Sequence, residues 1–121
     1  MLKLSSLIIL YFLSRVAFAA ECETFTGFKI KEKLCFDKSI SGWISEKCIT
    51  DKNCLAKKFF TIKKKVSLPD LVGGQNPATM YCHQLKLEIL ILKDSSDNEQ
   101  SFCQFPDRSI VDANAVEGFL E

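Results

Sequence analysis

The sequence predicts a small α+β protein that is stabilised by disulfide bonds, with an N-terminal β-meander followed by a helix and a β-hairpin. Three observations lead to this fold class. All six cysteines lie beyond a leader-like N-terminus, apolar and charged residues alternate after residue 28, and an Asn-Pro-Ala element precedes a second alternating stretch. The 121 residues are 47% hydrophobic and 26% charged, which excludes a large enzyme, a coiled coil and a disordered chain.

The first 19 residues have the organisation of a secretory signal peptide. Lys3 supplies a positive charge, residues 7–13 form an apolar segment, and Ala17 and Ala19 are small residues ahead of the expected cleavage site. The apolar segment is much shorter than the roughly 20 residues that span a bilayer. We therefore expect export with cleavage after Ala19 and no transmembrane segment in the mature chain.

Every cysteine remains in the mature chain, and an even number of cysteines in an exported protein indicates disulfide bonds. Zinc is not expected, because zinc sites use closely spaced pairs, whereas Cys48 and Cys54, the nearest pair, have five residues between them. Each disulfide is expected to contribute about 2 to 4 kcal/mol to stability. No metal ion or cofactor is predicted.

Charge divides the mature chain into two segments. Residues 20–66 hold 11 lysines against 6 acidic residues, whereas residues 67–121 hold 3 basic residues against 9 acidic ones. At the boundary, Pro69, Gly73 and Gly74 are typical of a linker. The predicted organisation is a signal peptide (1–19), a lysine-rich β unit with four cysteines (20–66), a linker (67–75) and a helix-hairpin unit (76–121).

The lysine-rich unit is expected to form a three-stranded meander. Apolar residues from Phe28 to Phe36 alternate with lysines, as in a strand with one buried face, and only Glu32 interrupts the alternation. A turn should follow at residues 37–42. Residues 43–50 and 59–66 are rich in β-branched and aromatic residues and are the expected second and third strands.

A basic run of three lysines, Lys63, Lys64 and Lys65, closes this unit. Such lysines ordinarily protect the edge of a sheet, and that is the simpler interpretation. The alternative is a weak contact between the basic unit and an anionic lipid or polymer. Nucleic acid is not an expected partner, because the run lacks interleaved aromatic residues and the protein leaves the cytosol.

The second unit is expected to hold a helix and a β-hairpin. Asn76 can cap the helix, and Pro77 suits its first position because a missing N–H costs nothing there. The elements in order are a helix over 78–85, a strand over 87–91, a turn over 94–99 and a returning strand over 101–105. A disulfide between Cys82 on the helix and Cys103 on the second strand would hold the helix across the hairpin.

This unit contains three short motifs, NPA, YC and C-x-FPD, whose spacing matches a known family pattern without a gap. Their residues are Asn76, Pro77, Ala78, Tyr81, Cys82, Cys103, Phe105, Pro106 and Asp107. The pattern, which covers about residues 74–112, resembles a bacterial family of small exported domains of unknown function that often carry a hemolysin label. The resemblance implies a periplasmic or surface-located protein of Gram-negative type with no established enzyme activity.

The sequence departs from that family at several positions. Residues 86–87 replace a glycine pair that usually follows the helix, and Arg108 stands where the family has the glycine of an FPDGS element. A further cysteine of the family is Val111 here. Because that additional partner is missing, the resemblance favours pairing Cys82 with Cys103.

Four cysteines then remain in the first unit, and three connectivities among them are open. The interpretation that we favour joins Cys48 with Cys54 and Cys22 with Cys35.

No catalytic constellation is found in the sequence. The single histidine, His83, adjoins Cys82, but neighbouring residues on a helix point about 100 degrees apart, and a disulfide-bonded cysteine offers no thiolate. There is no CxxC pair, no phosphate-binding glycine loop and no HExxH motif. The protein is therefore expected not to be an enzyme.

The leading hypothesis is a non-enzymatic binding or structural module of the bacterial cell envelope, acting on an envelope or secreted protein partner. Two alternatives are open. A membrane-active, hemolysin-like protein is suggested by the family label and the basic unit, although no cationic amphipathic helix is visible. An inhibitor of a secreted enzyme is the other, because rigid loops between disulfides suit insertion into an active site.

Overall fold

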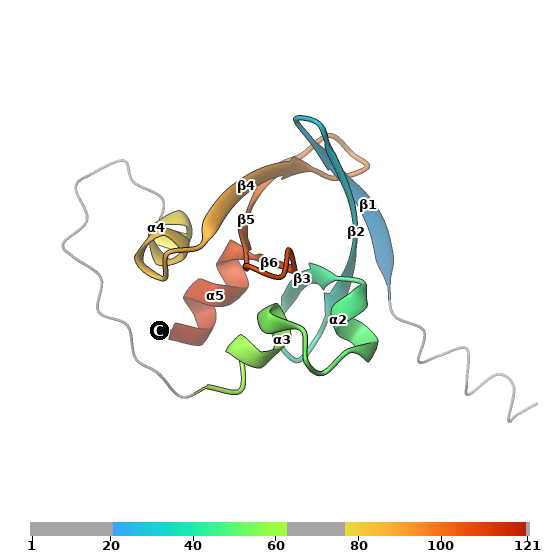
Figure 1. The fold of residues 1–121 in the computed structure, drawn as a ribbon. Helices are drawn as coiled ribbons and strands as arrows, with labels where there is room; N and C mark the ends of the chain where they lie inside the picture. The colour runs from blue at the N-terminus through green and yellow to red at the C-terminus, as the bar shows by residue number, and fades with distance from the viewer. Residues whose placement is uncertain (1–20, 63–76, 121) are drawn as a thin grey trace, which may run out of the picture.

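The computed structural model describes residues 21–62 and 77–120 of the chain. Their strands form a closed barrel in the order β1-β2-β3-β6-β5-β4, with every neighbouring pair antiparallel (Figure 1). The strands are β1 (Cys22–Gly27), β2 (Ile30–Asp37), β3 (Gly42–Ser45), β4 (Glu88–Lys93), β5 (Glu99–Gln104) and β6 (Ile110–Asp112). The helices are α2 (Lys47–Thr50), α3 (Leu55–Phe59), α4 (Pro77–Gln84) and α5 (Ala113–Leu120).

The predicted fold class, an α+β arrangement of a meander followed by a helix and a hairpin, is wrong. The described residues form a strand-dominated antiparallel barrel with small helices. Strands from the two charge segments pair with each other, since Ile44 of β3 faces Val111 of β6 and Thr26 of β1 faces Lys93 of β4. Closure gives partners to backbone groups that a separate meander and hairpin would leave unpaired at their edges.

Two of the expected strands also take other forms. The segment 43–50 is a strand only as far as Ser45, and its remainder forms α2. Residues 59–62, the described part of the expected strand 59–66, contain the end of α3 and a turn. In residues 59–62 the aromatic residues Phe59 and Phe60 pack against a buried cluster, whereas in α2 only Cys48 is buried and Ile49 and Thr50 are exposed. The local preference of β-branched residues for strands therefore does not decide the structure in either place.

The barrel interior is filled by apolar side chains. Phe25, Leu34, Leu92, Phe102 and Ile110 are fully buried and form one cluster. The ring of Phe25 meets the ring of Phe102 edge to face, with 5.4 Å between the ring centroids. This geometry is the preferred one for aromatic pairs, so the inside of the barrel is a packed core.

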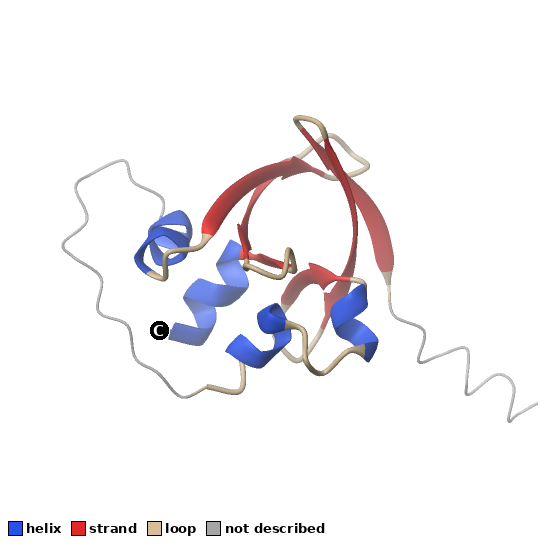
Figure 2. Cartoon of the chain, in the orientation of Figure 1, coloured by secondary structure: helices blue, strands red, loops and turns tan. Residues whose placement is uncertain are grey.

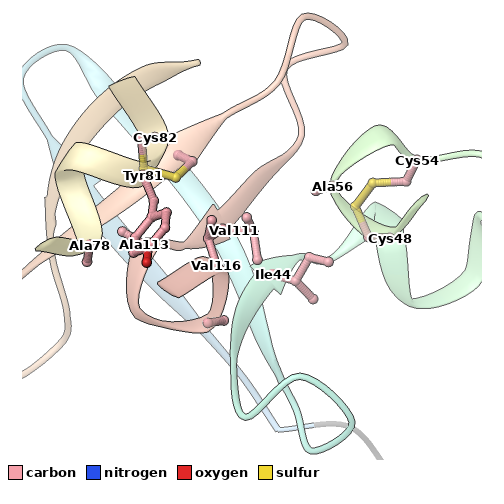
Figure 3. Close-up of a cluster of buried hydrophobic side chains, with 12 residues drawn as sticks. Ile44, Cys48, Cys54, Ala56, Ala78, Tyr81, Cys82, Val111, Ala113 and Val116 are labelled. Carbon is pink, nitrogen blue, oxygen red and sulfur yellow. A yellow bond between two sulfur atoms is a disulfide. The ribbon is translucent and has the colours of Figure 1, made fainter. Parts of the chain in front are cut away.

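A second core lies between the helices and the outer face of the barrel. The helices gather outside the ring of strands and contact β3, β5 and β6 (Figure 2). Figure 3 shows Tyr81 and Cys82 of α4 to the left of Val111 and Val116, with the disulfide between Cys48 and Cys54 on the other side of these valines in the same cluster. Strand β6 is therefore buried on both faces, because its other side contributes to the barrel interior.

Disulfide bonding, which the cysteine count predicts, is confirmed. Three disulfides join Cys22 to Cys35, Cys48 to Cys54 and Cys82 to Cys103, which are the pairs that the sequence interpretation favours. The first joins the neighbouring strands β1 and β2, the second links α2 to the start of α3, and the third fastens α4 to β5.

The start of α5 is packed closely against β3. Asp112 is 7% exposed, and its carboxylate accepts a hydrogen bond of 2.9 Å from the Asn114 N–H in the first turn of the helix. A Cβ at Gly42 would lie only 2.8 Å from the Ala115 Cβ, so glycine is required there. Burial raises the pKa of Asp112, although hydrogen bonds from the Asn114 and Trp43 backbones act in the opposite direction.

Candidate functional site

A hollow of about 680 Å³ opens at the end of the barrel where β4 begins and β5 ends. We call this hollow the barrel mouth. It combines strand residues that point into the barrel with residues of two connecting turns. They are Ile30, Glu32, Glu88 and Gln104 from the strands, and Lys86, Phe105, Pro106 and Arg108 from the turns.

The polar strand residues of the mouth share a face with the apolar core. Successive side chains of a strand point to opposite faces, so Glu32 lies on the same face as Leu34, which is part of the interior cluster. By the same alternation, Glu88 lies on the same inward face of β4 as Leu92, and Gln104 lies on the same inward face of β5 as Phe102. The interior therefore changes from apolar to polar toward this end.

The two cations of the mouth stand in tight turns. Lys86 follows α4 with a φ of 60°, and its N–H donates to the His83 carbonyl at 2.9 Å. Arg108 has a φ of 69° in the β5–β6 turn, where its N–H donates to the Phe105 carbonyl at 2.9 Å. A side chain in this left-handed region costs on the order of 1 kcal/mol that glycine would not incur.

The four charges of the mouth make no ion pair with any described residue. Neither carboxylate, Glu32 or Glu88, lies at salt-bridge distance from a cation in residues 21–62 and 77–120, and the same holds for Lys86 and Arg108. Some charges elsewhere on the surface do pair, as in the 3.7 Å contact between Lys93 and Asp97, while others, such as Glu99, likewise make no ion pair with a described residue. The mouth thus presents two carboxylates and two cations that the described fold does not use.

A second hollow of about 320 Å³ adjoins the mouth along the ends of β2 and β3. It shares Glu32 and Arg108 with the mouth, so the two hollows are contiguous. Its other charged groups are already engaged, since Lys33 pairs with Glu46 at 3.1 Å and the Lys47 ammonium donates to the Asp107 carbonyl at 2.8 Å. Of the charged residues that line the two hollows, those with neither an ion pair nor a side-chain hydrogen bond to a described residue therefore all line the mouth.

The turn that carries Arg108 is held firmly by Asp107. One carboxylate oxygen accepts the Leu55 N–H of α3 at 3.0 Å, and the other accepts the Ser109 N–H at 3.0 Å. The Ser109 hydroxyl in turn accepts the Ala56 N–H at 3.0 Å. Burial acts to raise the pKa of Asp107, but the hydrogen bonds outweigh it, so the pKa lies below its ordinary value.

Some of the described motif residues are buried in the core, and the others lie at or beneath the barrel mouth. Ala78, Tyr81 and Cys82 are buried on α4, where they pack in the helix-covered cluster with Cys103. The remaining members are Pro77 at the first position of α4, Phe105 and Pro106 at the mouth, and Asp107 beneath it. The motif therefore joins α4 to the β5–β6 turn and does not bring catalytic groups together.

Several residues of the sequence interpretation lie outside the described part of the chain. They are the signal peptide (1–19), the linker (67–75), the helix cap Asn76 and the basic run of Lys63, Lys64 and Lys65. His83 is described and lies exposed on α4.

One cluster has the composition of a metal site but not its chemistry. The ligand atoms of Cys22, Cys35 and Glu46 lie within 4.8 Å of one another. Both sulfurs are joined in a disulfide, and Glu46 pairs with Lys33, so these groups are not available as thiolate and carboxylate ligands.

Sequence reasoning did not identify the mouth as a site, although it named Phe105 and Pro106 as motif residues and Arg108 as a departure from the family pattern. A further signal was Glu32, an acidic residue at a position where the alternation of β2 predicts an apolar one. Nothing in the linear sequence placed Glu88, Gln104 or Arg108 beside it.

Comparison of the chain with protein-family models, with curated proteins and with solved structures finds no match. Within residues 21–62 and 77–120, no helix has the length and apolar character needed to cross a membrane.

Proposed function

We propose that this protein is a non-enzymatic, exported binding module of the bacterial cell envelope, and that it binds its partner at the barrel mouth. The observation that carries this proposal is that four charges, none of which makes an ion pair with a described residue, line one open hollow. Charged groups that a fold leaves unpaired in a concave site are available to a partner, and they give specificity when the partner's charges are complementary.

The disulfides support the location and the absence of catalysis. All six cysteines are in disulfides, which persist in oxidising compartments such as the bacterial periplasm. A disulfide-bonded cysteine also cannot act as a thiolate nucleophile. The motif resemblance of residues 74–112 adds the cell envelope of a Gram-negative bacterium as the location.

The proposal is tested by comparing two variants of the oxidised mature protein in affinity capture from envelope extract. Glu32→Gln/Glu88→Gln removes both carboxylates of the mouth, and Glu21→Gln/Glu99→Gln removes two exposed carboxylates that do not line it. We expect the wild type and the second variant to retain a specific protein that the first variant loses. Equal capture by all three proteins would show that the mouth is not the binding surface.

Catalysis is tested separately with the same material. Oxidised protein that turns over a substrate in the extract, with activity that persists through purification, would overturn the non-enzymatic part of the proposal.

A second candidate function is contact with an anionic lipid surface, and it has its own observation. Phe28, in the β1–β2 turn, is 88% exposed, and the Lys29 ammonium lies 5.4 Å from the centre of its ring. An exposed aromatic residue beside lysines suits the boundary between anionic headgroups and acyl chains. Sedimentation with phosphatidylserine-containing vesicles that Phe28→Ser abolishes would support this candidate, and no sedimentation of the wild type would remove it.

A further inference from the structure

Building on the proposed function, we infer that the barrel mouth receives a basic side chain of an extended peptide segment in the partner, with acidic residues on either side of that basic residue. The inference concerns the chemistry of the partner, and it follows from where each charge of the mouth stands.

The carboxylates stand on the strand wall of the mouth, where Glu32 is half-buried and Glu88 is exposed. Glu32 on β2 and Glu88 on β4 belong to the two strands that flank β1, and both continue faces that lead into the barrel interior. Gln104, half-buried on β5, adds an amide to the same wall. A lysine ammonium or an arginine guanidinium donates hydrogen bonds only, so it suits a wall made of carboxylate and amide oxygens.

Apolar groups line the route to these oxygens. Ile30, Phe105 and Pro106 belong to the same hollow. A basic side chain has a long aliphatic stem, which packs on apolar surface while its charged head reaches polar groups. A short cation without such a stem would leave these contacts unused.

The cations occupy the rim. Lys86 and Arg108 are both exposed and come from turns that adjoin the strand ends. Residues that flank an inserted basic side chain would pass close to this rim. Carboxylates at those flanking positions would meet Lys86 and Arg108, and arginine can bind a carboxylate through two parallel hydrogen bonds.

The shape favours a peptide segment over a small molecule. Sites for small molecules enclose most of their ligand, whereas the mouth is open and continues into the second hollow past Glu32 and Arg108. An extended segment can lie along both hollows. Polyanions such as nucleic acid are disfavoured, because two carboxylates balance the two cations at this site.

The test uses a capped pentapeptide, glycine-glutamate-lysine-glutamate-glycine, titrated into the oxidised mature protein and followed by amide NMR. We expect saturable shifts confined to the mouth, at residues 30–32, 86–88 and 104–108. A matched peptide with glutamine in place of lysine should bind at least tenfold more weakly. Glu32→Gln/Glu88→Gln should weaken the lysine peptide by a similar factor, while Glu21→Gln/Glu99→Gln should leave its binding unchanged.

The rim is tested with Lys86→Gly/Arg108→Gly, because glycine adopts the left-handed backbone of both positions. This variant should bind the lysine peptide severalfold more weakly. It should also bind this peptide about as well as a variant peptide with glutamines in place of the glutamates.

The outcomes separate this inference from the proposed function. Equal binding of the lysine and glutamine peptides, or no binding of either, would overturn the inferred chemistry even if partner capture still depended on the mouth. Loss of mouth-dependent capture would overturn the proposed function itself. Because the peptide comparison uses the wild-type protein, it does not depend on whether any variant folds.

Discussion

The two ends of the barrel interior are built on the same strands but have opposite character. In β2 the inward positions pass from Leu34, fully buried, to Glu32 at the mouth, and in β4 they pass from Leu92 to Glu88. The apolar end holds the barrel together, whereas the polar end adds charges that make no ion pair with the described residues. The apolar inward positions provide stability, and the binding that we propose takes place at the polar inward positions of the same sheet.

The largest expected effect separates the two ends by mutation. Phe102→Ala should lower the free energy of unfolding by about 3 to 5 kcal/mol, because it empties a fully buried position next to Phe25. Glu32→Gln should change it by no more than about 0.5 kcal/mol, since this half-buried carboxylate has no ion pair with described residues to lose. Urea unfolding of the oxidised proteins, followed by circular dichroism, measures both. If Glu32→Gln lowered the free energy of unfolding as much as Phe102→Ala, the mouth would have to be regarded as part of the stabilising core.

Removing a disulfide should have the next largest effect. Loss of the bridge between Cys82 and Cys103, with 21 residues of sequence separation, should cost about 3 kcal/mol through the entropy of the unfolded chain. Loss of the bridge between Cys48 and Cys54, with a separation of 6, should cost about 2 kcal/mol. Paired Cys→Ala variants in the same unfolding assay test the order. The reverse order would show that packing at α2 and α3, and not loop length, determines the contribution.

Asp107 and Asp112 should respond to pH in opposite directions. Asp107 has a lowered pKa, so its contribution to stability is present above the ordinary value of 3.8 and is lost as pH falls through the lower folded value. Asp112 has a raised pKa, so the contribution of this residue to stability is fully present below the ordinary value of 3.8 and is lost as pH rises through the higher pKa of the folded state.

Asparagine substitutions test these signs. Asp107→Asn should cost about 1 to 2 kcal/mol at neutral pH and less in acid, because it weakens the hydrogen bonds to Leu55 and Ser109. Asp112→Asn should be better tolerated at neutral pH than in acid, because a buried charge is removed there. Unfolding free energies at neutral pH and below pH 3.8 provide the comparison, and a shared direction for the two variants would contradict it.

The smallest expected effect concerns the rim of the mouth. Lys86→Gly and Arg108→Gly should each change stability by about 0.5 kcal/mol or less, because relief of the left-handed backbone is offset by greater freedom of the unfolded chain. Lys31→Gly, at the second residue of β2, is the matched control and should cost about 1 kcal/mol. Thermal unfolding resolves the contrast. Equal losses at all three positions would mean that the rim lysine and arginine contribute to the fold.

Local sequence patterns correctly predicted the type and approximate position of several helices and strands. Alternation around Leu34 corresponds to β2, the Pro77 helix corresponds to α4, and the hairpin corresponds to β4 and β5. These patterns repeat with the period of one element, so they can be recognised within a short segment. The strand predicted at 43–50 extended too far, since the chain forms α2 after residue 46 and buries Cys48 there, while the strand-favouring Ile49 and Thr50 stay exposed.

The candidate site could not be predicted in the same way. Glu32 was visible as an exception to the alternation of β2, but its neighbours at the mouth come from the start of β4 and the turn after β5. These residues come close together only because of which strands pair. Strand pairing is made by backbone hydrogen bonds, and because nearly every residue can form them, the sequence says little about which strands will pair.

The sequence by itself determined the oxidised cysteines, the presence of a strand around Leu34, and the order of helix and hairpin in the second segment, because each follows from composition or from a local period. It did not determine the full inward face of β2, since Phe28 and Phe36, expected on that face, are exposed. The tertiary structure alone decided that β3 pairs with β6 and β1 with β4. These pairings close the barrel and bring Glu32, Glu88 and Arg108 around one hollow. The physical reason is that closure satisfies strand edges from distant parts of the chain, and no short segment encodes its distant partner.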